Sequence, residues 1–155
     1  MSELFTIRPA QDRDLIYLQM ICEDGDLGII DTIEHCTVAV NAEDVPVGFI
    51  HIETVDDDNP GANAAYVYPV AVFASWQHHG VARALIEHEL QRVGELRLVA
   101  CSSSQGFYPK VGFERVAWEC IAERIASDCD HCDKRANCEP VPFAIKEAAR
   151  QPGLS

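Results

Sequence analysis

The sequence predicts a single domain of the mixed α/β class, in which strands and helices alternate along the chain. Its 155 residues lie within the usual range for one domain. Hydrophobic residues make up 48% and charged residues 24%, which is typical of a folded globular protein. Apolar residues follow a two-residue period in some segments and a helical period in others. We therefore expect one domain over residues 1–150, followed by a tail at 151–155.

In the first half of the chain, alternating or continuous apolar residues predict four strands, at 4–8, 36–40, 45–55 and 64–73. A helix is expected at 10–23, where Leu15 and Leu18 fall on one face. The turn residues at 56–61 predict a hairpin between the third and fourth strands. Pro69 interrupts the fourth strand, and because proline has no N–H for the ladder, we expect a bulge or a sheet edge there.

In the second half, helical spacing of apolar residues predicts a helix at 80–93. A continuous apolar run predicts a buried strand at 96–101. A short helix is expected at 103–111, a strand at 113–121 and a closing strand at 141–146. The polar, cysteine-rich segment between the last two strands, 124–139, predicts a loop.

Charge restricts the partners of this chain. Asp and Glu outnumber Lys and Arg by 25 to 12, for a formal net charge of −13. Such a surface repels nucleic-acid and lipid phosphates and attracts cationic small molecules, or else it serves solubility alone. We expect no nucleic-acid partner. Because the N-terminus lacks the pattern of a signal peptide and no run approaches roughly 18 apolar residues, we also expect a cytoplasmic protein without a membrane span.

The segment from Val70 to Arg83 passes from a strand through a short loop into a helix. The first turn of a helix exposes unpaired N–H groups and the positive end of the helix dipole. Gly80 and Ala82 are small enough to let a phosphate approach the main chain. This junction is therefore a candidate anion-binding site, although many such junctions bind nothing.

Two segments carry a resemblance to a known family. Gln77-His78-His79-Gly80-Val81-Ala82 resembles the Q/R-x-x-G-x-G/A signature of the GNAT superfamily of N-acetyltransferases, and Phe107-Tyr108-Pro109-Lys110-Val111-Gly112-Phe113 resembles its FYxKxGF segment. The resemblance covers residues 4–123, with both segments in the family's order. It implies a mixed, mostly antiparallel sheet of six to seven strands flanked by helices, with acetyl-CoA as the co-substrate.

The resemblance also implies roles for individual residues. The main-chain amides of the signature would bind the CoA pyrophosphate; they belong to Gln77, His78, His79, Gly80, Val81 and Ala82. Val70 and Val72 would pair with the pantetheine arm, and the amide at Val72 would stabilise the oxyanion of the tetrahedral intermediate. Tyr108 matches the general acid that protonates the departing thiolate. The alternative for Tyr108 is a packing role on a helix face.

The chain departs from the family pattern at the general base. Many relatives have a glutamate four residues before the Val72 position, where this chain has Tyr68. His51, Glu53 and the acidic run 56–58 are substitutes, as is a chain of water molecules, and the sequence assigns no base. The asparagine that many relatives place before the tyrosine helix is replaced by Cys101 and three serines at 102–104, which could cap that helix or bind pantetheine.

The seven cysteines fall into two groups. Cys22, Cys36 and Cys101 lie among apolar residues and are expected to be buried as small hydrophobic side chains. Cys129, Cys132 and Cys138, with Cys120 upstream, have part of the spacing of a structural zinc site. Because only one C-x2-C pair is complete, we favour free thiols there and predict no metal site. Structural zinc and a redox-active or disulfide-forming loop are the alternatives.

These features together predict an acyl-CoA-dependent N-acetyltransferase whose acceptor is the amine of a small molecule. One alternative is a protein acetyltransferase acting on lysine side chains or an N-terminus, since it would share every motif. The other is a non-catalytic acetyl-CoA-binding or metal-responsive sensor, which the missing carboxylate at Tyr68 keeps open. Relatives often form homodimers, and the sequence leaves both the oligomeric state and the acceptor's identity open.

Overall fold

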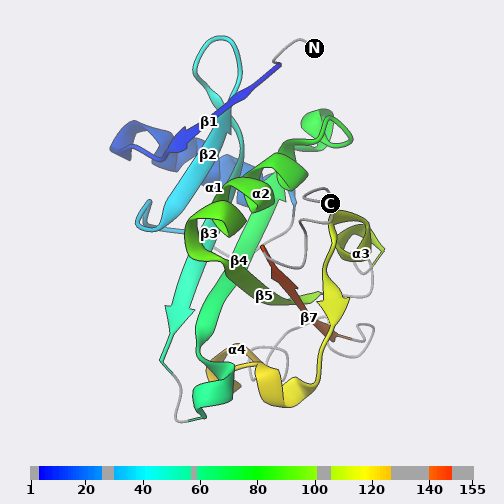
Figure 1. Ribbon diagram of the computed structural model, residues 1–155. Coiled ribbons are helices and arrows are strands. Elements are labelled where there is room, and N and C mark those ends of the chain that lie inside the picture. Colours follow the sequence, from blue (N-terminus) through cyan, green and yellow to red (C-terminus); the bar gives the residue numbers. More distant parts are fainter. Residues whose placement is uncertain (1–3, 26–29, 57–58, 101–105, 127–139, 148–155) are drawn as a thin grey trace. The chain divides into compact units, whose positions relative to one another are not determined.

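The computed structural model describes residues 4–25, 30–56, 59–100, 106–126 and 140–147 (Figure 1). The chain divides into two compact units. The first comprises Met1–Ile52 and Val67–Glu89, and the second Glu53–Tyr66 and Leu90–Ser155. Within the described residues, no helix is long and apolar enough to cross a membrane. The single domain over 1–150 stays a prediction.

Helices and strands are interspersed along the chain (Figure 1). The strands are β1 (Thr6–Pro9), β2 (Cys36–Val40), β3 (Pro46–Val55), β4 (Ala64–Val72), β5 (Glu95–Ala100), β6 (Glu114–Arg115) and β7 (Val141–Lys146). The α-helices are α1 (Leu15–Asp24), α2 (Val81–Val93), α3 (Phe107–Val111) and α4 (Glu123–Ala126). The 3-10 turns are η1 (Asp12–Asp14), η2 (Pro60–Ala62), η3 (Ala74–Trp76) and η5 (Trp118–Cys120).

Among the described residues, the strands form one seven-stranded sheet in the order β1-β2-β3-β4-β5-β7-β6. Strand β4 pairs with β5 in parallel, whereas the pairs β1–β2, β2–β3, β5–β7 and β6–β7 are antiparallel. The prediction of a mixed, mostly antiparallel sheet of six to seven strands flanked by helices is therefore confirmed.

The core of the first unit joins α1 to β2 and β3. Inward-facing residues alternate along β2 and recur at helical spacing along α1, so both periods meet in one cluster. The members of this cluster are Leu18, Ile21, Cys22, Cys36, Val38, Val40 and Phe49. Cys22 and Cys36 are thus buried among apolar side chains, as predicted.

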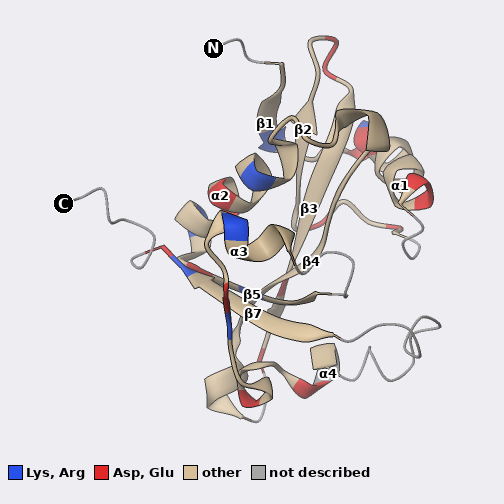
Figure 2. Ribbon diagram, turned by 90° about the vertical axis from the view of Figure 1, so that its right-hand side faces the viewer, with Lys and Arg blue, Asp and Glu red and all other residues tan. Residues whose placement is uncertain are grey.

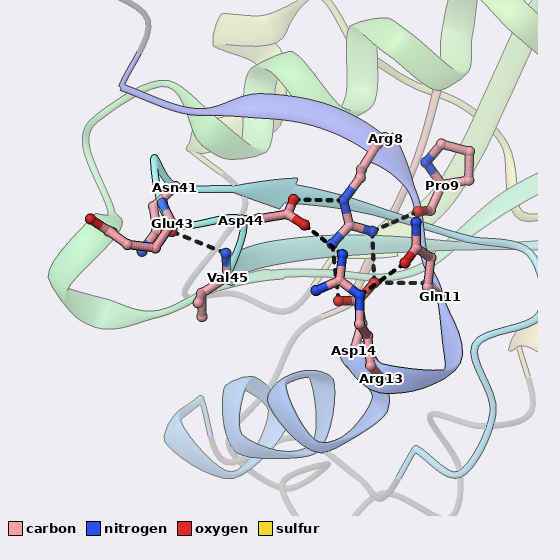
Figure 3. A network of polar contacts seen from close by, with 9 residues as sticks. All are labelled: Arg8, Pro9, Gln11, Arg13, Asp14, Asn41, Glu43, Asp44 and Val45. Atoms are coloured by element: carbon pink, nitrogen blue, oxygen red, sulfur yellow. Dashed lines mark hydrogen bonds and ion pairs between the residues drawn. The ribbon is translucent and has the colours of Figure 1, made fainter.

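A network of charged side chains ties β1 to the start of α1 and to the turn between β2 and β3 (Figure 3). Asp14 is fully buried and accepts hydrogen bonds from Arg8 at 2.8 and 3.1 Å and from the Gln11 N–H at 2.7 Å. Asp44 in the turn accepts from both Arg8 and Arg13. Burial alone would raise the pKa of Asp14, but the bonds from Arg8 and Gln11 lower it below its usual value.

In the second unit, Tyr66 and Arg97 hold the segment that follows β6. The Tyr66 hydroxyl accepts the Ala122 N–H at 2.8 Å and lies within hydrogen-bonding distance of the Ala62 and Cys120 carbonyls. Arg97 donates to the carbonyls of Cys120 and Gly61. The apolar ring of Tyr66 is buried in the cluster below this segment. One side chain therefore supplies both apolar and polar contacts there.

Two predictions about elements are wrong, and one alternative of a third is excluded. The strand expected at 113–121 ends at Arg115 and gives way to η5, because Tyr66 and Arg97 hold the Cys120 carbonyl outside any ladder. The loop expected at 124–139 begins inside α4, and residues 127–139 lie outside the described part of the chain. Of the two alternatives for Pro69, the sheet edge is excluded, since β4 lies between β3 and β5 in the strand order, and the bulge stays a prediction.

Candidate functional site

The junction between β4 and α2 lies wholly in the first unit. After β4 ends at Val72, the chain makes the turn η3 and then adopts left-handed backbone conformations at His78 (φ 70°) and Gly80 (φ 82°). Helix α2 begins at Val81. Glycine adopts this conformation without steric cost, so Gly80 lets the chain turn sharply into the helix.

The first hydrogen bond of the α2 ladder runs from the Ala84 N–H to the Gly80 carbonyl, at 3.0 Å. The amides of Val81 and Ala82 precede this bond, so they belong to the helix start, where N–H groups have no partner within the helix. Gly80 is exposed, and a Cβ placed on it would meet no atom within 4 Å. An anion can therefore approach these amides and the positive end of the helix dipole.

The amides just before this point already have partners. The Ala74 N–H donates to the Asp24 carboxylate at 2.8 Å, the Trp76 N–H to the Phe73 carbonyl, and the Gln77 N–H to the Ala74 carbonyl at 3.3 Å. The amide of Gln77, the first of the six predicted pyrophosphate contacts, is thus engaged within the loop. Asp24 was missed in the sequence because an acid at a helix end carries no signal for a distant loop.

The side chains of the signature surround the helix start. His78 and His79 are exposed, and the His79 ring lies edge-on to Trp76 with a centroid distance of 5.6 Å. The Gln77 side-chain amide lies 3.5 Å from the Val72 carbonyl. Arg83 follows on the first turn of α2 and pairs with Glu87 one turn later, with 3.8 Å between the charged atoms. Figure 2 shows both basic (blue) and acidic (red) positions on α2. Basic and amide groups therefore lie close to the helix start.

The main-chain N–H groups of β4 point alternately toward β3 and away from it. The Phe73 N–H donates to the Val47 carbonyl of β3 at 2.9 Å. Because successive N–H groups of a strand point to opposite edges, those of Val72 and Val70 point away from β3. The register of β4 with β5 joins Ala65 to Leu96 and Tyr66 to Arg97, so both valines lie farther along β4 than these pairs.

Gly48 in β3 lets β4 and α2 approach closely. A Cβ on Gly48 would lie 2.9 Å from Val81 Cγ1, 3.1 Å from the Ala71 carbonyl oxygen and 3.1 Å from Val72 Cγ2. A glycine inside an otherwise apolar strand is the available sequence signal for such an approach. The close approach at Gly48 was not predicted from the sequence. The structure therefore brings Val72 and Val81 together over Gly48.

Tyr108 lies in α3, in the second unit. It is half-buried, and its ring contacts the rings of Phe107, Phe113 and Phe143 at centroid distances of 5.1, 5.4 and 6.0 Å. The helix ends at Gly112, whose N–H is within reach of the Tyr108 carbonyl. These contacts fix the direction of the ring, which both a packing role and a proton-donating role require.

The substitutes for the missing base differ in their surroundings. Tyr68 is exposed, and its main-chain carbonyl oxygen lies 2.7 Å from Nδ1 of His51 in β3. Glu53 is half-buried and Asp56 is exposed. The His51 ring is thus linked directly to the main chain of β4.

No group of three or more potential metal-ligating side chains occurs in the described ranges. Cys120 is half-buried with a free thiol. Cys129, Cys132 and Cys138, and also Cys101 and the serines at 102–104, fall outside those ranges. Free thiols at the cysteine-rich segment therefore stay a prediction.

Comparison with known proteins gives independent evidence on the family of this chain. A family model described as "Acetyltransferase (GNAT) domain" matches residues 32–115, more than half of the chain. An uncharacterised N-acetyltransferase of Chlorobaculum tepidum is 25% identical over 80 residues, which make up 50% of this chain and 52% of that protein. The chain therefore spans about half the length of this curated relative.

Solved structures share the fold. N-acetylglutamate synthase from Neisseria gonorrhoeae, complexed with coenzyme A and N-acetyl-glutamate, superposes with a TM-score of 0.71 at 14% identity, covering 94% of this chain and 36% of that one. The ribosomal-protein-S18-alanine N-acetyltransferase from Escherichia coli has a TM-score of 0.64 at 16% identity, covering 92% and 93%. At these identities the likeness establishes the fold alone.

Proposed function

Because this chain belongs to the GNAT acetyltransferase family, we propose that it is an N-acetyltransferase that moves the acetyl group of acetyl-CoA directly onto the amine of a small molecule. The acidic chain, with its net charge of −13, favours a cationic acceptor. We propose further that it acts in the cytoplasm.

The observation that carries this proposal is the start of α2. The amides of Val81 and Ala82 lie before the first ladder bond, beside an exposed Gly80 without a side chain. In our proposal these amides, with those of His78, His79 and Gly80, hold the diphosphate of acetyl-CoA. The Gln77 amide is already used within the loop, so Gln77 contributes through its side chain.

The side of β4 that faces away from β3 supports the proposed position of the thioester. The N–H groups of Val70 and Val72 point away from β3, so they can pair with an extended pantetheine arm as an added strand would. The Val72 amide then donates to the thioester carbonyl. Negative charge grows on that oxygen as the amine attacks, so a fixed donor there lowers the barrier.

Tyr108 is proposed as the proton donor to the departing CoA thiolate. Protonation of a leaving group by a positioned side chain typically accelerates a reaction by about 10²–10⁴-fold. The three aromatic neighbours of Tyr108 hold its ring, and the position of the ring in turn fixes where the hydroxyl lies. Tyr108→Phe preserves these ring contacts and removes the hydroxyl alone.

The experiment measures thiol release from acetyl-CoA by the purified protein with a panel of polyamines, amino acids and peptides. Release with small amines supports the proposal, whereas release with peptides alone assigns a protein acetyltransferase. Tight acetyl-CoA binding without release from any acceptor assigns a sensor. Tyr108→Phe should lower turnover by about 100-fold and leave acetyl-CoA affinity within about twofold; unchanged turnover would reject its role.

A further inference from the structure

Asp24, the last residue of α1, is bonded to the loop that leads to the proposed diphosphate site. Its carboxylate accepts the Ala74 N–H at 2.8 Å. Both residues belong to the first unit. Ala74 is the first residue of η3, the turn that connects β4 to the signature at 77–82. One carboxylate therefore joins the end of α1 to the segment between β4 and α2.

The turn η3 receives its N-terminal cap from this distant helix. A helical turn leaves its first N–H groups without partners inside the turn, and a polar side chain of the preceding residue often accepts one of them. The residue before η3 is Phe73, whose side chain has no acceptor, and it forms no such cap. The Asp24 carboxylate takes this place. Because the acceptor is charged, the bond is stronger than one between neutral groups.

Main-chain bonds carry the position of Ala74 on toward the signature. The Ala74 carbonyl accepts the Gln77 N–H at 3.3 Å, and the Phe73 carbonyl accepts the Trp76 N–H at 2.8 Å. The Phe73 side chain packs against the apolar cluster of α1, β2 and β3. The N–H and the carbonyl of Ala74 are thus both bonded, and its position determines where the residues that follow it begin.

Asp24 is unfavourable for its own helix. The C-terminal end of a helix carries the negative end of the helix dipole, so an acid there is disfavoured. Aspartate also has a lower helix propensity than alanine. The last turn of α1, residues 21–24, contains no basic residue. Residues that break such local rules are expected at functional sites.

The charge of Asp24 also opposes an anionic ligand on this loop. Acetyl-CoA carries negative phosphates, and a nearby carboxylate repels them. A benefit of Asp24 for cofactor binding must therefore come from the geometry that its hydrogen bond imposes. Charge and geometry consequently predict effects of opposite sign when the carboxylate is removed.

We propose that Asp24 is a positioning residue for acetyl-CoA, which holds η3 so that the amides at the start of α2 face the diphosphate; this rests on the proposed function. Asp24 acts through the Ala74 N–H. Without the bond the loop samples other conformations, and the apparent affinity falls with the fraction of competent loops. Because the bond is exposed, we expect about a tenfold effect, the lower end of what losing a hydrogen bond to a charged group produces.

Three variants separate geometry from charge. Asp24→Ala removes the acceptor, whereas Asp24→Asn loses the charge but keeps an oxygen that can accept the Ala74 N–H. Glu23→Ala is the matched control, since it removes the same charge from the neighbouring exposed residue of α1. Calorimetry measures the acetyl-CoA dissociation constant, and steady-state kinetics with the best small amine gives KM and kcat.

Asp24→Ala should raise the dissociation constant and the KM for acetyl-CoA about tenfold and leave kcat within about twofold, because the loop holds a part of the cofactor that does not react. Asp24→Asn and Glu23→Ala should bind acetyl-CoA at least as tightly as wild type. If Asp24→Ala binds as tightly as Glu23→Ala, charge alone accounts for both variants and the positioning role is overturned.

Ala74→Pro tests whether Asp24 acts through this N–H. Proline at the first position of a helical turn removes the N–H and presets φ. Phe73 has φ −52° and ψ 142°, the extended conformation that a following proline requires. Asp24→Ala should weaken acetyl-CoA binding in the wild-type background and have little further effect beside Ala74→Pro. Equal weakening in both backgrounds would place the action of Asp24 elsewhere and overturn the proposal.

A further readout needs no cofactor. Hydrogen exchange followed by NMR should show the Ala74 N–H exchanging faster in Asp24→Ala than in Glu23→Ala, and equal rates would overturn the inference. Wild-type protein that does not bind acetyl-CoA overturns the proposed function. Wild-type protein that binds it, beside an Asp24→Ala variant with the same dissociation constant, overturns only the role of Asp24, so the two failures are distinguished.

Discussion

Replacing Gly48 with alanine adds one methyl group where β4 and the start of α2 leave no room for it. The new Cβ would lie 2.9 Å from Val81 Cγ1 and 3.1 Å from both Val72 Cγ2 and the Ala71 carbonyl oxygen. The Ala71 oxygen belongs to the main chain, so a change of side-chain rotamer cannot relieve this contact and the strands themselves must shift. Overpacking of this kind typically costs about 1–3 kcal/mol of unfolding free energy.

The same shift should weaken acetyl-CoA binding, because Val81 carries one of the amides proposed to hold the diphosphate. Losing one hydrogen bond to a charged group costs about 1.5–3 kcal/mol, and about 1.4 kcal/mol corresponds to a tenfold change in affinity. Calorimetry should therefore show a dissociation constant raised at least about tenfold, under conditions where urea titration shows the variant to be folded.

Two further variants make this test specific. Gly61→Ala is the matched control, since a Cβ there would meet only the Asn59 side-chain oxygen at 3.5 Å, an ordinary contact. Adding Val81→Ala to Gly48→Ala removes the nearest clashing atom and should restore part of the affinity. If Gly48→Ala binds acetyl-CoA within twofold of wild type and unfolds at the same urea concentration, the role assigned to this close approach is refuted.

Three other predictions concern stability and reactivity. Asp14→Asn should lower the free energy of unfolding by about 2 kcal/mol at pH 7, because the amide makes weaker hydrogen bonds with Arg8 than the carboxylate does. The folded-state pKa of Asp14 is lowered, so wild type loses this contribution as pH falls through that pKa. Urea titrations of wild type and variant should therefore converge in acid. Tyr66→Phe leaves the Ala122 N–H without its acceptor and should cost about 1–3 kcal/mol by the same measurement. The Cys36 thiol, buried and with its pKa raised to about 12, should resist alkylation at pH 8 until urea unfolds the protein, as mass spectrometry of labelled peptides can show.

Elements whose pattern is local were predicted closely. The strand expected at 36–40 is β2, and the one expected at 141–146 is β7, because each is a short apolar run bounded by polar or turn residues. The helix expected at 80–93 begins one residue later, at Val81, since Gly80 serves as its N-terminal cap. In each case the determining residues are neighbours in the sequence.

Features that depend on distant residues were not predicted. Residues 113–121 were predicted to form a strand, yet Tyr66 and Arg97 bind the Cys120 carbonyl and impose a turn. The glycine and small residues at the start of α2 were recognisable in the sequence, whereas the contacts of Asp24 with Ala74 and of His51 with Tyr68 join residues far apart. Such contacts require the folded chain.

The strand order places the two shortest strands at the borders of the sheet: β1 has four residues and β6 has two. A border strand exposes unpaired main-chain groups that can recruit a strand from another molecule. Here the template is brief, and it carries Arg8 and Pro9 on one border and Glu114 and Arg115 on the other. Edge-to-edge pairing between molecules is therefore discouraged at both borders of the sheet, and with it the growth of aggregates.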